Sequence, residues 1–556
     1  MVLIAVYWVF LFFLILPLGV LTGKILKVEQ ENPFITLLLG LVLLTCGFTL
    51  TAFFIPLGAV SLMIWTLASL ISGIYFKTKI KQLLIHLAQG LKTLPSYLKI
   101  IISILFFGTL LKSAQYPFVI DNESYYIQTI KWLNEYGFVK GLANLHIFFA
   151  QNSAWHILQA GTNLSFLTNR INDINGFVFI LCVVYCIIGG YKLNSAGKMY
   201  WLSFMPMVSI IPFLFLDVPS PDLPLLVITP IILHLYIQHI KGDSNFKIAL
   251  LLFIFLAFIK ITILPLGLLF LPGLVRRENI AFGAVCGVPV LLLWIAKNSI
   301  ISGYPFYPIA HVKLNVDWTV PKSIVDLIIH VTTDYGYKRD GVLPANTATA
   351  TKILFWVKQS GLAGIINKLT IAVLLAMPSF MLKDKKHKMI YVALLVNFLA
   401  VLFTSPQFRY FLYITLSGSL FVVAALSNFI KPNVKIIKAG LIAGSALIFV
   451  TFLNLGLSKL TSNKRHHQHG EVRLRQALIP EGVTKYPDML YLRQNTGNLN
   501  YYSPADNFLM FGTGNGKLPC VNKVQIDFMR RKFNVEPQLR SADMKDGFYS
   551  ARSLNK

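Results

Sequence analysis

The stretch VLIAVYWVFLFFLILPLGVLT (Val2–Thr22) decides the fold class, because it has no charged residue over the length of a membrane crossing. A helix needs about 20 mainly apolar residues to span the hydrocarbon core of a bilayer. A signal peptide would have a basic segment before this stretch and a good cleavage site after it. Neither feature is present, so we expect a retained span. Residues Ile35–Phe76 are also uncharged, and only 13% of the chain is charged, against about 25% in soluble proteins. The sequence therefore predicts an all-α polytopic membrane protein and excludes a soluble globular one.

The formal net charge of +27 comes from basic residues that gather in short links between apolar runs. Examples are Lys77–Lys81, Lys383–Lys388 and Lys431–Lys438. Cytoplasmic loops of membrane proteins are enriched in Lys and Arg, so we expect these links on the cytoplasmic side. Basic residues interleaved with aromatic ones, as in a platform for single-stranded nucleic acid, do not occur. Membrane lipids are therefore expected partners, and nucleic acid is not.

Charge and apolarity together predict about 13–14 transmembrane helices, with the N-terminus outside. A single helix over 248–275 would leave Arg276 and Arg277 outside, so we expect two short helices there, hinged near Lys260 and Pro265. The other spans are expected near 2–22, 34–54, 56–76, 97–114, 174–191, 200–216, 223–240, 280–296, 365–382, 389–404, 409–430 and 437–457.

This topology divides the chain into three parts. An N-terminal three-span module would cover 1–96, and a transmembrane core would cover 97–457. The core would carry two long outer loops, 115–173 and 297–364, and the polar tail 458–556 would form a small extracytoplasmic domain. The tail also contains His466, His467 and His469, but no second cluster of ligands supports a metal site there.

The sharpest chemical feature is Asp121-Asn122-Glu123 at the start of the first outer loop. A helix is expected to follow as far as Tyr136, with Gly137 after its end. Its apolar stripe would place it along the membrane surface, with both acids near the headgroup of an amphiphilic substrate. Asp121 or Glu123 could act as a general base, or the pair could hold Mg²⁺ or Mn²⁺. Alternatively, Asp121 only caps the helix and Glu123 sits favourably at its positive end.

Other polar residues are expected at the same outer face of the membrane. Asp217 and Asp222 flank a proline-containing turn between two spans, where ionisable residues often have a function. Cations near outer ends could bind phosphate, and a histidine in the first loop could orient substrate. The substrate-binding candidates are Asp217, Lys260, Lys297, Asn298, Arg409 and His146, and Asp222 joins the acids as a catalytic candidate. A solvated turn and snorkelling to lipid phosphate are the alternatives for the acids and the cations.

The acidic motif and its place resemble those of the GT-C superfamily of polytopic glycosyltransferases. Three further stretches resemble a bacterial branch of GT-C-like membrane proteins: WLNEYGFVKGLANLH (132–146), KNSIISGYPFYP (297–308) and SPQFRY (405–410). The resemblance covers roughly 100–460. It departs from the common pattern because three spans precede the span that leads into the acidic loop.

This resemblance implies a transferase of cell-envelope polysaccharide biosynthesis in the bacterial cytoplasmic membrane, with its active site outside. It would move a sugar from a polyprenyl-phosphate donor to a glycan, lipid or protein acceptor, with inversion. Asp121 would be the base or a metal ligand, with Glu123 as its partner, and Arg409 and Lys260 would bind the donor phosphate. We therefore expect the side chains of Asp121 and Arg409 to share one outward-facing cavity.

Two other classes remain open on sequence grounds. A glycan or lipid flippase or transporter would have a similar number of spans, but such proteins often show inverted repeats. An O-antigen polymerase or ligase would also have many spans and a large outer loop. ATP-driven transport is not expected, because the chain has no GxxxxGK[ST] phosphate-binding motif.

Overall fold

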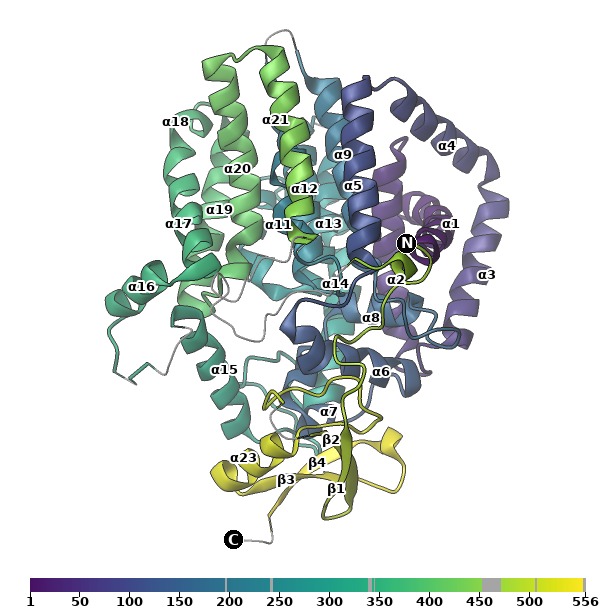
Figure 1. The fold of residues 1–556 in the computed structure, drawn as a ribbon, viewed down its shortest axis with the longest axis vertical. Helices are drawn as coiled ribbons and strands as arrows, with labels where there is room; N and C mark the ends of the chain where they lie inside the picture. Colours follow the sequence, from purple (N-terminus) through teal and green to yellow (C-terminus); the bar gives the residue numbers. More distant parts are fainter. Residues whose placement is uncertain are drawn as a thin grey trace.

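The computed structural model describes residues 1–195, 198–240, 244–338, 343–344, 346–452, 472–505 and 508–553. A bundle of long helices forms one end of the molecule, and short helices and strands form the other (Figure 1). The predicted span near 437–457 and the predicted tail each lie partly outside the described residues, and His466, His467 and His469 lie wholly outside them.

Nine helices within the described residues are long and apolar enough to cross a membrane. They are α1 (Val2–Ile25), α2 (Pro33–Thr51), α5 (Ser96–Ser113), α9 (Ile174–Leu193), α14 (Arg277–Ser302), α17 (Gly361–Ala376) continued by α18 (Pro378–Met381), α19 (Lys385–Thr404), α20 (Phe408–Ile430), and α21 (Val434–Ala446) continued by η5 (Leu447–Phe452). The chain is therefore a mainly helical polytopic protein, as predicted.

The remaining predicted spans are also helical, but they are short or bent. α3 (Ala59–Tyr75) meets α4 (Lys77–Lys92) at 88°, and the pair would make a tenth span. The segment Trp201–Phe213 consists of η3 (Trp201–Phe204), α10 (Met205–Val208) and α11 (Ile210–Phe213). The others are α12 (Asp222–Gln238), α13 (Asn245–Ile259) and η4 (Ile261–Phe270). The number of full-length spans is thus lower than predicted, because each of these helices is shorter than the roughly 20 residues that a membrane crossing usually takes.

The hinge predicted within 248–275 is confirmed. α13 ends at Ile259, Lys260 has an extended backbone (φ −155°, ψ 117°), and η4 follows. Pro265 lies inside η4, where a tighter 3-10 geometry replaces the α-helix. The hinge places the Lys260 side chain at the end of α13.

The N-terminal helices pack directly on the rest of the bundle. α1 and α2 approach closely at Gly19 and Gly40, where a β-carbon would collide with the backbone of the facing helix. The indole of Trp8 donates a hydrogen bond to Asp173, 2.5 Å away, at the start of α9. The predicted three-span module is therefore an integral part of the bundle.

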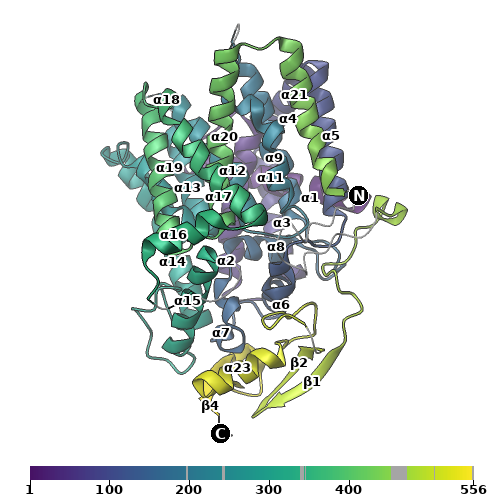
Figure 2. The ribbon, with the colours of Figure 1, turned by 60° about the vertical axis from the view of Figure 1, so that its left-hand side comes forward.

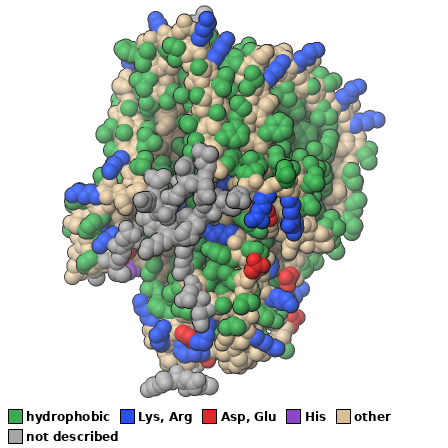
Figure 3. All heavy atoms as spheres, in the orientation of Figure 1, with side chains coloured by type: hydrophobic (Ala, Val, Ile, Leu, Met, Phe, Trp, Pro, Cys, Tyr) green, Lys and Arg blue, Asp and Glu red, His purple; other side chains and the backbone are tan. Residues whose placement is uncertain are grey.

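Charge and apolarity are distributed over the surface as a membrane environment requires. Hydrophobic side chains cover much of the helical part of the face in view, and Lys and Arg side chains mark its upper edge (Figure 3). α4 lies at this end of the bundle and carries Lys77, Lys79, Lys81 and Lys92 (Figure 1). One end of the bundle therefore carries a basic fringe, as expected from the links between the apolar runs.

The first long loop folds into η1 (Asn122–Tyr126), a π-helical turn, α6 (Ile127–Glu135), α7 (Leu142–Leu145), η2 (Ile147–Gln151) and α8 (Ala154–Thr162). The helix after Asp121 is confirmed, and Gly137 follows its end with φ +73°. The apolar stripe of this helix does not face the membrane surface as predicted, because other parts of the protein bury Ile127, Ile130 and Leu133.

The second long loop starts later than predicted. α14 continues to Ser302, so Lys297 and Asn298 lie in its last turns. The loop then contains α15 (Lys322–Tyr337) and α16 (Thr349–Lys358). Figure 2 shows α15 at the same end of the molecule as α6, α7 and the C-terminal strands.

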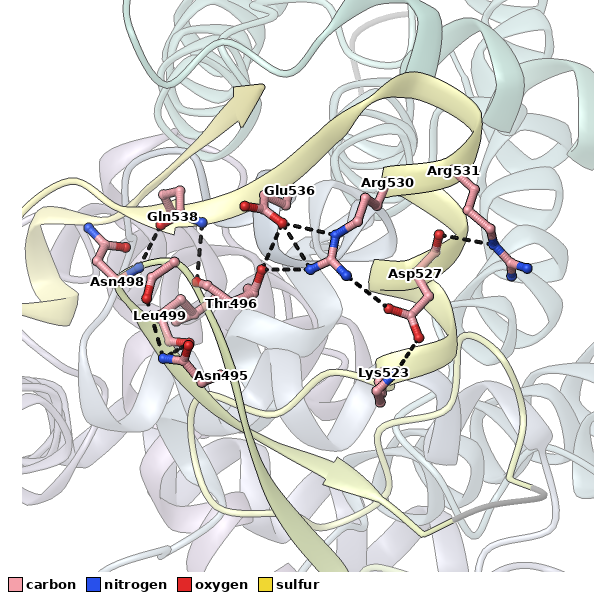
Figure 4. A network of polar contacts seen from close by, with 11 residues as sticks. Asn495, Thr496, Asn498, Leu499, Lys523, Asp527, Arg530, Arg531, Glu536 and Gln538 are labelled. Atoms are coloured by element: carbon pink, nitrogen blue, oxygen red, sulfur yellow. Dashed lines mark hydrogen bonds and ion pairs between the residues drawn. The ribbon is translucent and has the colours of Figure 1, made fainter. Parts of the chain in front are cut away.

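The described tail is a small α+β unit. After η6 (Leu474–Ala477), β1 (Tyr491–Thr496) pairs antiparallel with β2 (Leu499–Pro504), and β3 (Val535–Leu539) pairs with β4 (Phe548–Arg552). α23 (Lys523–Phe533) lies between the two hairpins in sequence. The Arg530 guanidinium joins them by contacting Glu536 of β3 and the hydroxyl of Thr496 in β1 (Figure 4). The side chain of Arg540 also binds Asp317 of the second loop at 2.6 Å, so the tail packs against both loops.

Candidate functional site

Four charged residues from distant parts of the chain meet at one end of the bundle. Asp121 immediately precedes η1, and Asp222 is the first residue of α12. Lys260 lies at the hinge between α13 and η4, and Arg409 is the second residue of α20. Each residue thus sits at a helix terminus, where a polar side chain can leave the apolar bundle.

These four side chains form a continuous chain of alternating charge. Arg409 makes an ion pair with Asp121, and its Nη1 lies 4.0 Å from Oδ2 of Asp222. Lys260 forms an ion pair with the other oxygen of Asp222. The side chain of Asp222 is 4% exposed, whereas those of Asp121 and Arg409 are 19% and 22% exposed. The outer pair is therefore accessible, and Asp222 lies behind it as a buried anion between two cations.

An aromatic ring completes this cluster. The Lys260 ammonium lies 3.9 Å from the centre of the Tyr410 ring, and the Arg409 guanidinium lies 5.3 Å from it. At such distances the face of an aromatic ring attracts a cation. Tyr410 was not among the predicted site residues, although it follows Arg409 directly in the SPQFRY stretch.

The Asp121–Arg409 pair lies in the wall of an apolar cavity of about 310 Å³. Ile211 and Leu214 line it on one side, and Leu362 and Ile366 of α17 and Leu412 of α20 also contribute. The expectation that Asp121 and Arg409 share one cavity is confirmed. A largely apolar cavity with a few convergent polar groups suits a ligand that has an apolar body and a charged head.

Glu123 points away from this cluster. Residues two apart on a helical turn do not face the same side, so Asp121 and Glu123 diverge. The Glu123 carboxylate is buried and accepts hydrogen bonds from the Thr484 hydroxyl at 2.7 Å and the Lys485 backbone N–H at 3.0 Å. Burial raises the pKa of Glu123, and the bond from Thr484 opposes that shift. The predicted partnership of Glu123 with Asp121 is therefore not formed.

The tail binds the acidic turn, residues 121–126, and the following helix α6 at several further points. The backbone N–H groups of Thr513 and Gly514 donate to the Glu123 carbonyl at 2.9 and 2.8 Å. Asn122 donates to the Val483 carbonyl at 2.8 Å, and Lys131 donates to the Gly516 carbonyl at 2.9 Å. π-Helical turns occur often at functional sites, and here the C-terminal domain holds one in place. No local sequence pattern indicates these contacts, because they join residues more than 360 positions apart.

His146 also contacts the tail and lies outside the charged cluster. Its Nε2 is 3.0 Å from the Phe511 carbonyl, and its Nδ1 accepts a hydrogen bond from the Phe148 N–H. Burial lowers the pKa of His146 to about 4. It is thus a neutral histidine that helps to join the loop to the tail.

Asp217 makes a separate ion pair with Lys112 of α5 at 2.7 Å, and the two side chains are 0% and 2% exposed. Lys297 donates to the Asn152 carbonyl at 2.6 Å, and Asn298 donates to that of Pro305 at 3.4 Å. The structure thus places Asp217, Lys297 and Asn298 beside other partners, outside the alternating chain of charges.

His156 of α8 lies near the cluster. Burial lowers its pKa to about 3, with a smaller contribution from the Lys297 charge. Within the described residues, neither ring nitrogen of His156 has a hydrogen-bond partner. Its ring contacts that of Tyr126 at 4.4 Å between centroids, directly behind the acidic turn.

The predicted Mg²⁺ or Mn²⁺ site between Asp121 and Glu123 does not fit these contacts. One carboxylate is neutralised by Arg409, and the other is bound by Thr484 and Lys485. In the part of the chain that the structure describes, no three His, Cys, Asp or Glu residues are grouped to hold a metal ion.

A family model described as a domain of unknown function, DUF8201, matches residues 1–416. The chain belongs to this family. No curated protein and no solved structure matches it. The DUF8201 match includes Asp121, Asp222, Lys260 and Arg409, whereas the C-terminal α+β unit lies beyond it.

Proposed function

We propose that this protein is a membrane glycosyltransferase with a GT-C-like fold that takes its sugar from a polyprenyl-phosphate donor. The observation that carries the proposal is the Asp121–Arg409 ion pair in the wall of the apolar cavity. A polyprenyl phosphate has the same two parts, a long apolar chain and an anionic head. The cavity would bind the chain, and the cations would bind the head.

The four charged residues then have distinct roles. The phosphate would take the place of Asp121 as the partner of Arg409, whose planar guanidinium suits phosphate oxygens. Lys260 would bind the same phosphate as a point charge. Asp222, which is buried and contacts both cations, would keep them in position.

Displacement of Asp121 from Arg409 would free its carboxylate to act as a general base. The acceptor hydroxyl loses its proton to Asp121, and its oxygen forms a bond to the anomeric carbon of the donor. The bond between that carbon and the phosphate oxygen breaks, and the electron pair leaves with the polyprenyl phosphate. Arg409 and Lys260 stabilise the negative charge that develops there. Attack from the opposite face inverts the anomeric configuration.

The charge pattern supports one orientation in the proposed bacterial cytoplasmic membrane. The basic fringe that includes α4 would face the cytoplasm. The Asp121 cluster, the N-terminus and the C-terminal domain would face outwards, where a glycan, lipid or protein acceptor of the cell envelope would be available.

The test uses the full-length protein in lipid nanodiscs with radiolabelled polyprenyl-phosphate sugars and a cell-envelope acceptor extract. Wild type should transfer label, and Asp121→Asn should lower the rate by roughly 10²–10⁴-fold. Asp326→Asn, which removes an exposed acid of α15, is the matched control and should keep the wild-type rate. Equal rates for wild type and Asp121→Asn would exclude the base role, and no transfer by wild type from any donor would overturn the function.

A further inference from the structure

A second cavity, of about 410 Å³, lies between the first loop and the tail. Unlike the apolar cavity, it is lined mainly by polar and aromatic side chains. Tyr116 and Arg170 come from the loop, and Arg475, Glu481 and Asn515 come from the tail. The cavity therefore exists only because the C-terminal domain packs against the loop.

One short segment separates the two cavities. Tyr116 lines the polar cavity, whereas Phe118–Asp121 line the apolar one. Two residues further on, Glu123 binds Thr484, which is again part of the polar wall. The acidic turn thus has an apolar cavity on one side and a polar cavity on the other.

The polar wall contains a buried hydrogen-bonding group that other described residues leave unsatisfied. The side-chain oxygen of Asn515 is buried and accepts no hydrogen bond from the described part of the chain. Its backbone carbonyl, in contrast, accepts a bond from Lys131 at 3.0 Å. A buried acceptor without a partner is costly, so it marks a position where a ligand hydroxyl or a water would be stabilised.

The mixture of groups indicates the chemical class of the ligand. Arg170 and Arg475 can only donate hydrogen bonds, Glu481 accepts when ionised, and Asn515 can do both. A hydroxyl needs both kinds of partner, whereas the Glu481 carboxylate would repel a simple anion. Glu481 is held in the wall by Gln476, which donates to it at 3.4 Å. The tyrosine rings offer flat apolar faces, against which the C–H face of a sugar ring can pack.

We infer that this cavity binds a saccharide, which is the acceptor of the proposed transfer. Only the role of the saccharide as acceptor rests on the proposed function, because saccharide binding can be measured without any transfer. In this arrangement, the lipid-linked donor and the hydrophilic acceptor approach the acidic turn from its two sides. The acceptor class is then a glycan rather than a lipid or a protein.

The test measures binding of the full-length protein, in nanodiscs, to an array of neutral and acidic oligosaccharides. Wild type should retain at least one of them, and titration with that oligosaccharide gives its Kd. Asn515→Ala and Arg475→Gln should each raise that Kd tenfold or more. Arg531→Gln is the matched control, because Arg531 is an exposed arginine of the same domain whose side chain contacts Asp527 in its own helix (Figure 4).

Thermal unfolding of each variant shows whether the domain remains folded, and Arg475 is exposed, so its replacement should leave the fold intact. Retention of no oligosaccharide by wild type, or equal Kd values for wild type and both variants, would overturn the inference. Polyprenyl phosphate binding is measured on the same preparations. If wild type binds polyprenyl phosphate but no saccharide, the saccharide site fails alone. If saccharide binding depends on Asn515 but no donor reacts, the proposed function fails alone.

Discussion

The Arg409 guanidinium forms an ion pair with the Asp121 carboxylate, although 288 positions separate the two residues in the chain. The pair joins the start of α20 to the turn that opens the first loop. The ion pair therefore connects two segments that lie far apart in the sequence.

A double-mutant cycle should reveal the coupling within this pair. Asp121→Asn and Arg409→Gln each leave one charge in a half-buried place without its main partner, so each should destabilise the protein. The double variant should lose less stability than the sum of the single losses, with a coupling of about 1–3 kcal/mol. Thermal unfolding of the four proteins in the same nanodiscs measures this, and strictly additive losses would show that the pair is not coupled.

Filling the apolar cavity should block the lipid part of the donor. Leu362→Trp introduces a large side chain into the wall formed by α17, and we expect at least a tenfold loss of affinity for polyprenyl phosphate. Leu375→Trp is the control on the same helix, because Leu375 is 75% exposed and does not line the cavity. Equal binding by both variants would place the lipid chain elsewhere.

The Thr484 hydroxyl should stabilise the acidic turn. Thr484→Val removes the donor to the buried Glu123 carboxylate while keeping the shape of the side chain, and should cost about 1–3 kcal/mol. Hydrogen exchange should rise in η1 and α6. Thr484→Ser keeps the hydroxyl and should behave as wild type. If Thr484→Val and Thr484→Ser change the stability equally, the loss of the hydrogen bond is not the cause of the change.

Stability should fall in mild acid because of His146. Its pKa of about 4 in the folded protein lies below the ordinary histidine value of 6.5, so the unfolded chain takes up a proton first as the pH falls. The contribution of His146 to the free energy of unfolding is fully present above pH 6.5 and is lost progressively between pH 6.5 and 4. It amounts to about 3 kcal/mol. His146→Gln keeps a donor for the Phe511 carbonyl and cannot titrate, so its unfolding temperature should fall less over this range. Parallel pH profiles would contradict the prediction.

The candidate site could be predicted only in part from the sequence, as the acidic motif shows. The motif and the helix after it could be located from local signals, since a polar triplet preceded an amphipathic run. The shared cavity of Asp121 and Arg409 was also predicted correctly. The separation of Asp121 from Glu123 was not predicted, although residues two apart on a helical turn point to different sides. The candidates Asp217, Lys297 and Asn298 were selected by their place near span ends, and His146 by its place in the first outer loop. Neither criterion determines the partners of a side chain.

The amino-acid sequence by itself determined that Val2–Thr22 and most of the other long apolar runs form helices long enough to cross a membrane, and that the chain bends at Lys260. These properties depend on hydrophobicity, charge and proline over short windows, because lipid requires each spanning segment to satisfy its own backbone. Only the tertiary structure decided that Arg409 meets Asp121 and that Thr484 binds Glu123. Those contacts depend on how segments hundreds of residues apart pack together, and no local pattern encodes that packing.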